Sequence, residues 1–177
     1  MPPNFGPSGA SEYNDVLGAA TFLTARADVD SKRMGVWGGS YGGYLTALAL
    51  ARSSDIFAAG VDYAGVHDWT DLLKVYAAAG AKSAGDSLAW ASSPLSSIKQ
   101  WHSPVLVIQA DDDHNVPFDQ SVRLMTALRE QKVPSELIVI PNEIHDLLLH
   151  RSWLLYFHAQ SDFLDAHLLR GAESAQH

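Results

Sequence analysis

Cysteine is absent from this 177-residue chain, which excludes disulfide bonds, thiolate chemistry and cysteine-ligated metal sites. Long apolar runs are also absent: no stretch reaches 18 apolar residues, so no membrane span and no membrane partner are expected. Residues 1–10 have neither a basic segment nor an apolar segment of the kind found in a signal peptide. These absences predict a cytoplasmic location.

Positive charge is scarce as well. The chain has 12 Lys and Arg residues against 20 Asp and Glu residues, and a formal net charge of -8 at pH 7. That balance argues against a nucleic-acid partner. Seven of the eight histidines show no spacing typical of metal ligands, so neither a metal nor a cofactor is predicted. Hydrophobic residues make up 47% of the chain, which is enough for a sizeable core in one domain.

Helical and strand patterns alternate along the chain, which predicts an α/β fold with a mostly parallel sheet. Residues 1–11 are rich in Pro, Gly and Ser and are expected to form a tail ahead of one domain over residues 12–177. Helices are predicted over residues 12–27, 41–52, 68–76, 119–131 and 150–169, and strands over residues 34–37, 57–63, 104–109 and 135–140. The rest of residues 64–93 is expected to be irregular. The hydrophobic side chains expected to face the core include Trp37, Val122, Met125, Leu128, Trp153, Phe157, Leu164 and Leu168.

A glycine-flanked serine stands between a predicted strand and a predicted helix, in the run Gly38-Gly39-Ser40-Tyr41-Gly42. Strand, sharp turn and helix is the layout of a nucleophile elbow, in which small neighbours leave room for a strained serine backbone. Backbone N–H groups at the helix start, that of Tyr41 first, are placed to hold an oxyanion. The alternative is a glycine-rich turn whose serine only caps the helix.

Two further polar loops follow predicted strands. The run Asp111-Asp112-Asp113 follows the third strand, and His145 follows the fourth. Because active sites in such sheets lie at the carboxyl ends of the strands, Ser40, one of the aspartates and His145 are expected to meet there. The chain order Ser, Asp, His is that of α/β-hydrolases. A histidine takes the serine proton in this chemistry, and a carboxylate orients that histidine.

The segment Gly35–Thr46 strongly resembles the elbow of the prolyl oligopeptidase family of serine peptidases. Asp111–Pro117 resembles the family's acid loop, Glu143–Asp146 resembles its histidine loop, and the likeness runs from about Glu12 to Leu168. The resemblance implies a three-layer α/β-hydrolase-type fold. It also implies that Asp113 is the acid, because the family's acid lies three positions before the valine, here Val116. Asp111 and Asp112 remain alternatives.

The resemblance further implies an apolar pocket for the residue on the acyl side of the scissile bond. Its predicted lining and binding residues are Val66, Trp69, Tyr76, Asn115 and Val116. Flat aromatic walls suit a proline or a small aliphatic group. The alternative is that Trp69 and Tyr76 are ordinary core aromatics.

Some parts that the family resemblance implies are not matched in this sequence. These are a β-propeller, the first strands of the hydrolase sheet and the loop that supplies a second oxyanion donor. The strand over residues 34–37 is therefore expected to be an edge strand, and an apolar edge invites association. A homo-oligomer that covers this edge is expected, with a partner chain that supplies the strands as the alternative.

These observations predict a serine hydrolase that cleaves a small ester or short peptide through a Ser40–His145–Asp113 triad and an acyl-enzyme. The alternative is a catalytically weak or inactive partial peptidase domain that acts as a binding or assembly module. A third possibility is one half of a larger peptidase that is inactive alone.

Overall fold

The computed structural model describes residues 10–76 and 86–169. Four strands form one sheet in the order β1-β2-β3-β4, and every neighbouring pair is parallel. The strands are β1 (Gly35–Gly39), β2 (Ala59–Tyr63), β3 (Val105–Ala110) and β4 (Ser135–Ile140). This confirms the predicted α/β class with a parallel sheet.

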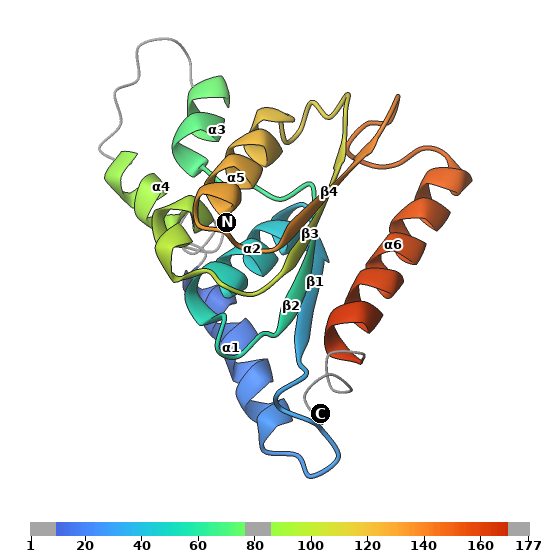
Figure 1. Cartoon of the computed structure of the whole chain (residues 1–177). Coiled ribbons are helices and arrows are strands. Elements are labelled where there is room, and N and C mark those ends of the chain that lie inside the picture. Colours follow the sequence, from blue (N-terminus) through green and yellow to red (C-terminus); the bar gives the residue numbers. More distant parts are fainter. Residues whose placement is uncertain (1–9, 77–85, 170–177) are drawn as a thin grey trace.

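Helices cover both faces of the sheet, which gives three layers (Figure 1). One face carries α1 (Ala10–Thr24), α2 (Tyr41–Ser53) and α5 (Asp119–Glu130), and the other carries α6 (His150–Leu168). Two short helices, α3 (Trp69–Tyr76) and α4 (Asp86–Ser92), and the 3-10 helix η1 (Pro94–Gln100) lie between β2 and β3 in the chain. No helix among the described residues is both long enough and apolar enough to cross a bilayer.

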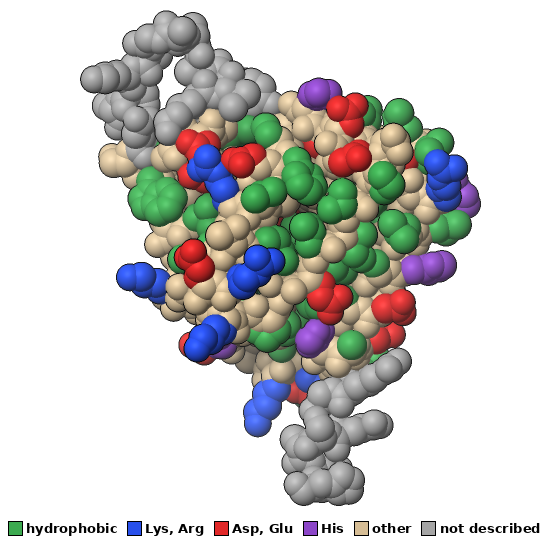
Figure 2. Space-filling model, turned by 45° about the horizontal axis from the view of Figure 1, so that its top comes forward, with side chains coloured by type: hydrophobic (Ala, Val, Ile, Leu, Met, Phe, Trp, Pro, Cys, Tyr) green, Lys and Arg blue, Asp and Glu red, His purple; other side chains and the backbone are tan. Residues whose placement is uncertain are grey.

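The inner strands β2 and β3 are buried at every position, as expected when both faces of a parallel sheet are covered. The register pairs Gly39 with Tyr63, Tyr63 with Ile108 and Ala110 with Ile140, which aligns the carboxyl ends of the strands. That edge is at the top of Figure 1. Figure 2 tilts it toward the viewer and shows hydrophobic side chains in the middle of the face, with charged side chains spread among them.

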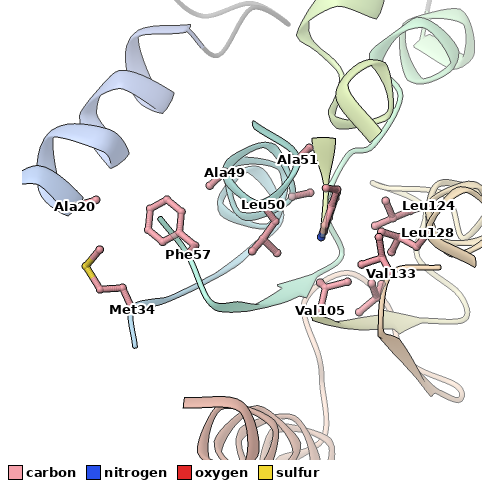
Figure 3. Close-up of a cluster of buried hydrophobic side chains, with 13 residues drawn as sticks. Ala20, Met34, Ala49, Leu50, Ala51, Phe57, Val105, Leu124, Leu128 and Val133 are labelled. Carbon is pink, nitrogen blue, oxygen red and sulfur yellow. The ribbon is translucent and has the colours of Figure 1, made fainter. Parts of the chain in front are cut away.

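The larger core lies between the sheet and the helices of α1, α2 and α5 (Figure 3). Leu50 of α2, Val105 of β3 and Leu124 of α5 are fully buried there. A second cluster joins the opposite face of the sheet to α6 through Tyr156 and Phe163. The two clusters fix the sheet between its helices and hold the loops at the carboxyl edge in place.

Three predicted core positions are wrong. Phe157 is 50% exposed, because Tyr156 and Phe163 make the buried stripe of α6. Val122 is 45% exposed, because α5 packs through Leu124 and Leu128.

Trp37 is the third, at 55% exposed. It lies on β1, which pairs with only one strand among the described residues.

The predicted boundaries also need correction. Helix α1 begins at Ala10 and ends at Thr24, so the last two residues of the predicted tail are helical. The stretch expected to be irregular contains α4. There the hydroxyls of Ser92 and Ser93 donate to carbonyl oxygens four residues earlier, which lets these polar residues remain in helical turns.

Candidate active site

Ser40 occupies a one-residue turn between β1 and α2. Its backbone is in the positive-φ region, with φ 56° and ψ -117°. The Ser40 N–H donates to the Tyr63 carbonyl oxygen (2.8 Å), and the Ser40 carbonyl accepts from the Tyr44 N–H (2.9 Å). A Cβ atom at Gly38 would lie 2.5 Å from the Gly42 carbonyl carbon, so a glycine is needed where the strand and the helix approach each other.

The Ser40 hydroxyl makes no capping hydrogen bond to α2. Its Oγ lies 2.8 Å from Nε2 of His145. The interpretation of Ser40 as a capping serine is therefore wrong. A positive-φ residue held in place by two backbone hydrogen bonds is the kind of strained position that recurs at functional sites.

His145 also contacts a carboxylate on its other side. Its Nδ1 lies 2.7 Å from Oδ2 of Asp113, whose side chain is fully buried. Because a carboxylate oxygen accepts, Nδ1 carries the proton and the Nε2 lone pair faces the Ser40 hydroxyl. Hydroxyl, imidazole and carboxylate thus form one continuous chain of hydrogen bonds, the arrangement in which a histidine acts as a general base.

Asp113 is the aspartate of this loop that reaches His145. Its Oδ1 accepts the backbone N–H groups of Asn115 (2.8 Å) and Val116 (2.9 Å), which folds the loop around the carboxylate. Asp111 instead accepts the Asn142 N–H at 2.7 Å. Asp112 lies exposed with an oxygen 3.1 Å from Nε2 of His114. The structure therefore brings Asp113 to the imidazole and directs the two alternatives elsewhere.

A buried glutamate anchors the loop that carries His145. Glu143 is 1% exposed and accepts from the Ser152 hydroxyl (2.6 Å) and from the N–H groups of Leu148 (2.7 Å) and Leu149 (3.1 Å). The Ser152 hydrogen bond is the main cause that lowers the pKa of Glu143. Because these donors lie at the start of α6, the carboxylate ties the loop to that helix.

Tyr63 supports the same loop from β2. Its hydroxyl donates to the His145 carbonyl oxygen, and its ring stacks on the imidazole with centroids 6.5 Å apart. Burial raises the pKa of Tyr63 above its ordinary range, so its hydroxyl keeps the proton that it donates. Tyr63 and Glu143 were not predicted from the sequence as supports for the site.

Most of the predicted pocket residues lie in one apolar cluster beside the elbow. Val66 and Val116 are each 4% exposed there, and Trp69 and Tyr41 pack against them. The Tyr41 and Trp69 ring centroids lie 6.4 Å apart. This packing fits both an acyl pocket and an ordinary aromatic core, so the pocket stays a prediction.

Asn115, another predicted pocket residue, is not in that cluster. Asn115 is exposed, and its backbone N–H is used by Asp113. The side chain of Tyr76 lies outside the described residues.

A second Asp–His pair lies buried beneath the elbow. The Asp62 and His67 side chains are fully buried, with Oδ2 and Nε2 2.6 Å apart. His67 Nδ1 contacts the Gln120 carbonyl oxygen at 2.9 Å. A Cβ atom at Gly43 would lie 2.5 Å from Asp62 Oδ1, so α2 packs directly on this carboxylate. An aspartate inside the apolar run Ala-Gly-Val-Asp-Tyr was the available sequence signal.

The predicted oxyanion donor, the Tyr41 N–H, lies at the start of α2. The Tyr41 N–H belongs to the first turn, where no intrahelical carbonyl accepts it. Within the described residues, no group of three or more His, Asp or Glu side chains is arranged to hold a metal ion. The side chains assembled at the sheet edge are a hydroxyl, an imidazole and a carboxylate joined by hydrogen bonds, a set that is chemically capable of acyl transfer.

Comparisons with known proteins show which family the chain resembles. The model of the prolyl oligopeptidase family matches residues 6–170. The chain is 28% identical over 155 residues to dipeptidyl peptidase family member 6 of Caenorhabditis elegans, an alignment that covers 79% of this chain and 21% of that protein. It is 31% identical over 144 residues to dipeptidyl peptidase 4 of Felis catus, which covers 78% and 19% respectively.

A solved structure shows the same fold. A puromycin-hydrolysing peptidase of Mycobacterium tuberculosis matches with a TM-score of 0.84 and 26% identity, over 92% of this chain and 26% of that one. This confirms the α/β-hydrolase-type fold. The chain spans about a fifth to a quarter of the length of these relatives.

Proposed function

Because this chain belongs to the prolyl oligopeptidase family of serine peptidases, we propose that it is a serine hydrolase that cleaves acyl bonds through Ser40, His145 and Asp113. One observation carries the proposal. The Ser40 hydroxyl, freed from capping, lies 2.8 Å from Nε2 of an imidazole whose Nδ1 lies 2.7 Å from a buried carboxylate. Such a relay makes a weak nucleophile reactive.

The proposed reaction has two halves. Ser40 Oγ attacks the substrate carbonyl carbon while His145 Nε2 takes the hydroxyl proton, and Asp113 stabilises the imidazolium that forms. The Tyr41 N–H donates to the oxyanion. His145 then gives its proton to the leaving amine or alcohol, which departs and leaves an acyl group on Ser40. Water attacks this ester while His145 takes its proton, and His145 then returns that proton to Ser40 Oγ as the carboxylic acid is released.

The substrate class follows from the family and from the apolar cluster beside Ser40. The family of peptidases suggests peptide substrates, and we propose a short peptide or a small ester. In this proposal Val66, Trp69, Tyr76 and Val116 form the wall around the acyl side chain, and Asn115 binds a substrate carbonyl. The Tyr41 and Trp69 rings provide flat apolar surface of the kind that suits a proline or a small aliphatic group.

We also propose that a second copy of this chain covers the free edge of β1. This strand pairs only with β2 among the described residues, and Trp37 on it is 55% exposed. Unpaired backbone groups beside an exposed indole favour association. The cytoplasmic location stays a prediction from the cysteine-free composition.

A fluorophosphonate probe tests the hydrolase proposal, because it reacts with an activated serine. We expect the folded chain to be labelled, and we expect Ser40→Ala and His145→Ala to abolish labelling. With p-nitrophenyl esters, Asp113→Asn should lower kcat by about 10⁴-fold, because the imidazole loses its carboxylate partner.

Asp112→Asn is the matched control, since Asp112 lies exposed one position away and contacts His114 instead. Its rate should stay within about threefold of the parent chain. Failure of the folded parent chain to react with the probe would overturn the proposal and favour a binding or assembly module.

A further inference from the structure

Gln109 lies fully buried near the carboxyl end of β3, between the acid loop and α5. Its Nε2 donates to Asp113 Oδ2 at 2.9 Å and to the Val116 carbonyl oxygen at 3.2 Å. Its Oε1 accepts from the Ser121 hydroxyl at 3.0 Å. Both ends of the side-chain amide are therefore used.

The orientation of this amide follows from its partners. A carboxylate oxygen and a carbonyl oxygen lie on one side, and both only accept. The nitrogen must face them, which leaves the oxygen toward Ser121, whose hydroxyl donates to it. Rotation of the amide by half a turn would place an oxygen against two acceptors and leave buried groups without partners.

The contact with Asp113 falls on the oxygen that matters for the histidine. Oδ2 accepts from Gln109 Nε2 and also lies 2.7 Å from His145 Nδ1. The two donors to Oδ1 belong to Asn115 and Val116, which are part of the same loop as Asp113. Gln109, in contrast, belongs to an inner strand of the sheet. It links the carboxylate to the rigid part of the fold.

We propose that Gln109 is a positioning residue that holds Asp113 Oδ2 in line with His145 Nδ1. This inference rests on the proposed roles of Asp113 and His145. Without the Gln109 donor, no hydrogen bond from β3 holds Oδ2 to the sheet. The carboxylate then turns about its Oδ1 hydrogen bonds, and the imidazole loses its fixed orientation.

The test compares two variants at this position with a matched control. Gln109→Met keeps an unbranched side chain of similar size and removes the donor. Gln109→Glu keeps the shape and places an acceptor against Oδ2. Gln120→Met is the control, because Gln120 is also a buried glutamine whose amide bonds backbone groups, those of His67 and Asp68, and it does not contact Asp113.

The first measurement is independent of catalysis. In the parent chain, the His145 Nδ1 proton bonded to Asp113 should give a far-downfield proton NMR signal, which His145→Gln assigns by removing it. We expect this signal to broaden or move in Gln109→Met and more strongly in Gln109→Glu, and to stay unchanged in Gln120→Met. Thermal unfolding of each variant separates this effect from a loss of stability.

The second measurement is the rate of fluorophosphonate labelling. Loss of one hydrogen bond to a charged group should slow labelling by about 10-fold to 100-fold in Gln109→Met. An unchanged His145 signal in folded Gln109→Met would overturn the positioning role. A parent chain that shows the signal but is not labelled would instead overturn the proposed hydrolase function, and the NMR comparison would still decide the role of Gln109.

Discussion

Ser40 combines a positive φ with a hydroxyl that makes no capping hydrogen bond to α2. A strained backbone conformation persists when contacts on both sides hold it in place. For Ser40 these contacts are the hydrogen bonds with the Tyr63 carbonyl and with the Tyr44 N–H in the first turn of α2. The position is therefore held against its own backbone preference. That cost is the expected signature of a residue kept for reactivity.

Replacement of Ser40 by glycine should relieve the backbone strain that replacement by alanine retains. Glycine adopts positive φ without the steric cost that a Cβ atom imposes. We expect Ser40→Gly to exceed Ser40→Ala in free energy of unfolding by about 1 kcal/mol, while both lose fluorophosphonate labelling. Urea unfolding followed by circular dichroism measures the difference. A glycine variant less stable than the alanine variant would show that this backbone is not strained.

Trp69 provides the residue-scale test of the pocket. If its ring is a wall for the acyl side chain, Trp69→Ala should raise KM for esters with apolar acyl groups by about tenfold and leave kcat within about twofold. Trp90→Ala is the control, because Trp90 is 45% exposed and lines a separate groove with Leu95 and Arg123. Equal KM values for the parent chain and Trp69→Ala would assign Trp69 to the core.

The site residues that could be predicted from the sequence are those that belong to a recognisable local motif. The resemblance to the family's acid loop, in which the acid lies three positions before a valine, favoured Asp113 over its two neighbours, and the structure brings that carboxylate to His145. Gln109 left no comparable signal. A glutamine at the end of a buried strand becomes informative only when the loop after it folds back onto its amide. The contact of Gln109 with Asp113 depends on the fold of the acid loop, which the hydrophobic periodicity of the sequence does not predict.

The elements fit together closely enough to explain the glycines around the elbow. Helix α2 approaches β2 so closely that a Cβ atom at Gly43 would lie 2.5 Å from Asp62 Oδ1 and 2.7 Å from the Tyr63 carbonyl oxygen. Gly42, one residue earlier, has open space around it. Close packing of the helix start on β2 therefore requires a glycine at one of these neighbouring positions and not at the other.

Helix α6 depends on Glu143, and this dependence should change with pH. Hydrogen bonds from Ser152 and the Leu148 N–H lower the pKa of Glu143 from its ordinary value of 4.5. A lowered pKa means that the carboxylate stabilises the folded state above about pH 4.5 and loses this contribution as the pH falls through the folded pKa. Glu143→Gln should thus be less stable than the parent chain at neutral pH, and the difference should shrink in acid.

Urea midpoints at about pH 7 and about pH 3.5 test this expectation. Ser152→Ala is the matched variant, because it removes one donor and keeps the carboxylate. It should lose less stability than Glu143→Gln at neutral pH. A difference between parent and Glu143→Gln that is the same at both pH values would assign the effect to packing.

All four strands were predictable at the level of elements, with ends within two residues. The β-branched residues of β3 and β4 contrast with their polar flanks, and β1 and β2 were recognised from shorter apolar runs. Helix α4 and η1 were not predicted. Their sequence is rich in Ser and Ala, and their serine hydroxyls bond to the helix backbone. Such residues favour turns as often as helices until tertiary contacts decide.

At the scale of the whole molecule, the parallel sheet brings distant loops to one edge. The acid loop and the histidine loop are joined there, since the Asp112 N–H donates to the Glu143 carbonyl (3.1 Å) and Asp111 accepts from Asn142. Asp111 and Asp112 thus serve to tie the two loops together. The sequence predicted, from the order of strands and helices, that the three loops lie at one edge. It did not predict the hydrogen bonds that connect the acid loop to the histidine loop.

The same sheet leaves β1 as an edge strand among the described residues. The Met34 carbonyl and the Ser40 N–H both bond to the segment of β2, which shows that even-numbered residues face that strand. By the alternation of a parallel ladder, the backbone groups of Trp37 and its odd-numbered neighbours point away from β2. No strand among residues 10–76 and 86–169 pairs with these groups, so the edge carries donors and acceptors beside an indole that is 55% exposed.

We expect the chain at micromolar concentration to elute as a dimer, with twice the 19.2 kDa chain mass by light scattering. Trp37→Pro should give a monomer, because proline removes an N–H that faces the free edge and leaves the bonds to β2 intact. Val122→Ala, which changes a 45% exposed side chain on α5, should stay dimeric. Elution of the parent chain as a monomer across the concentration range would contradict association through β1, because an uncovered edge would then be stable in solution.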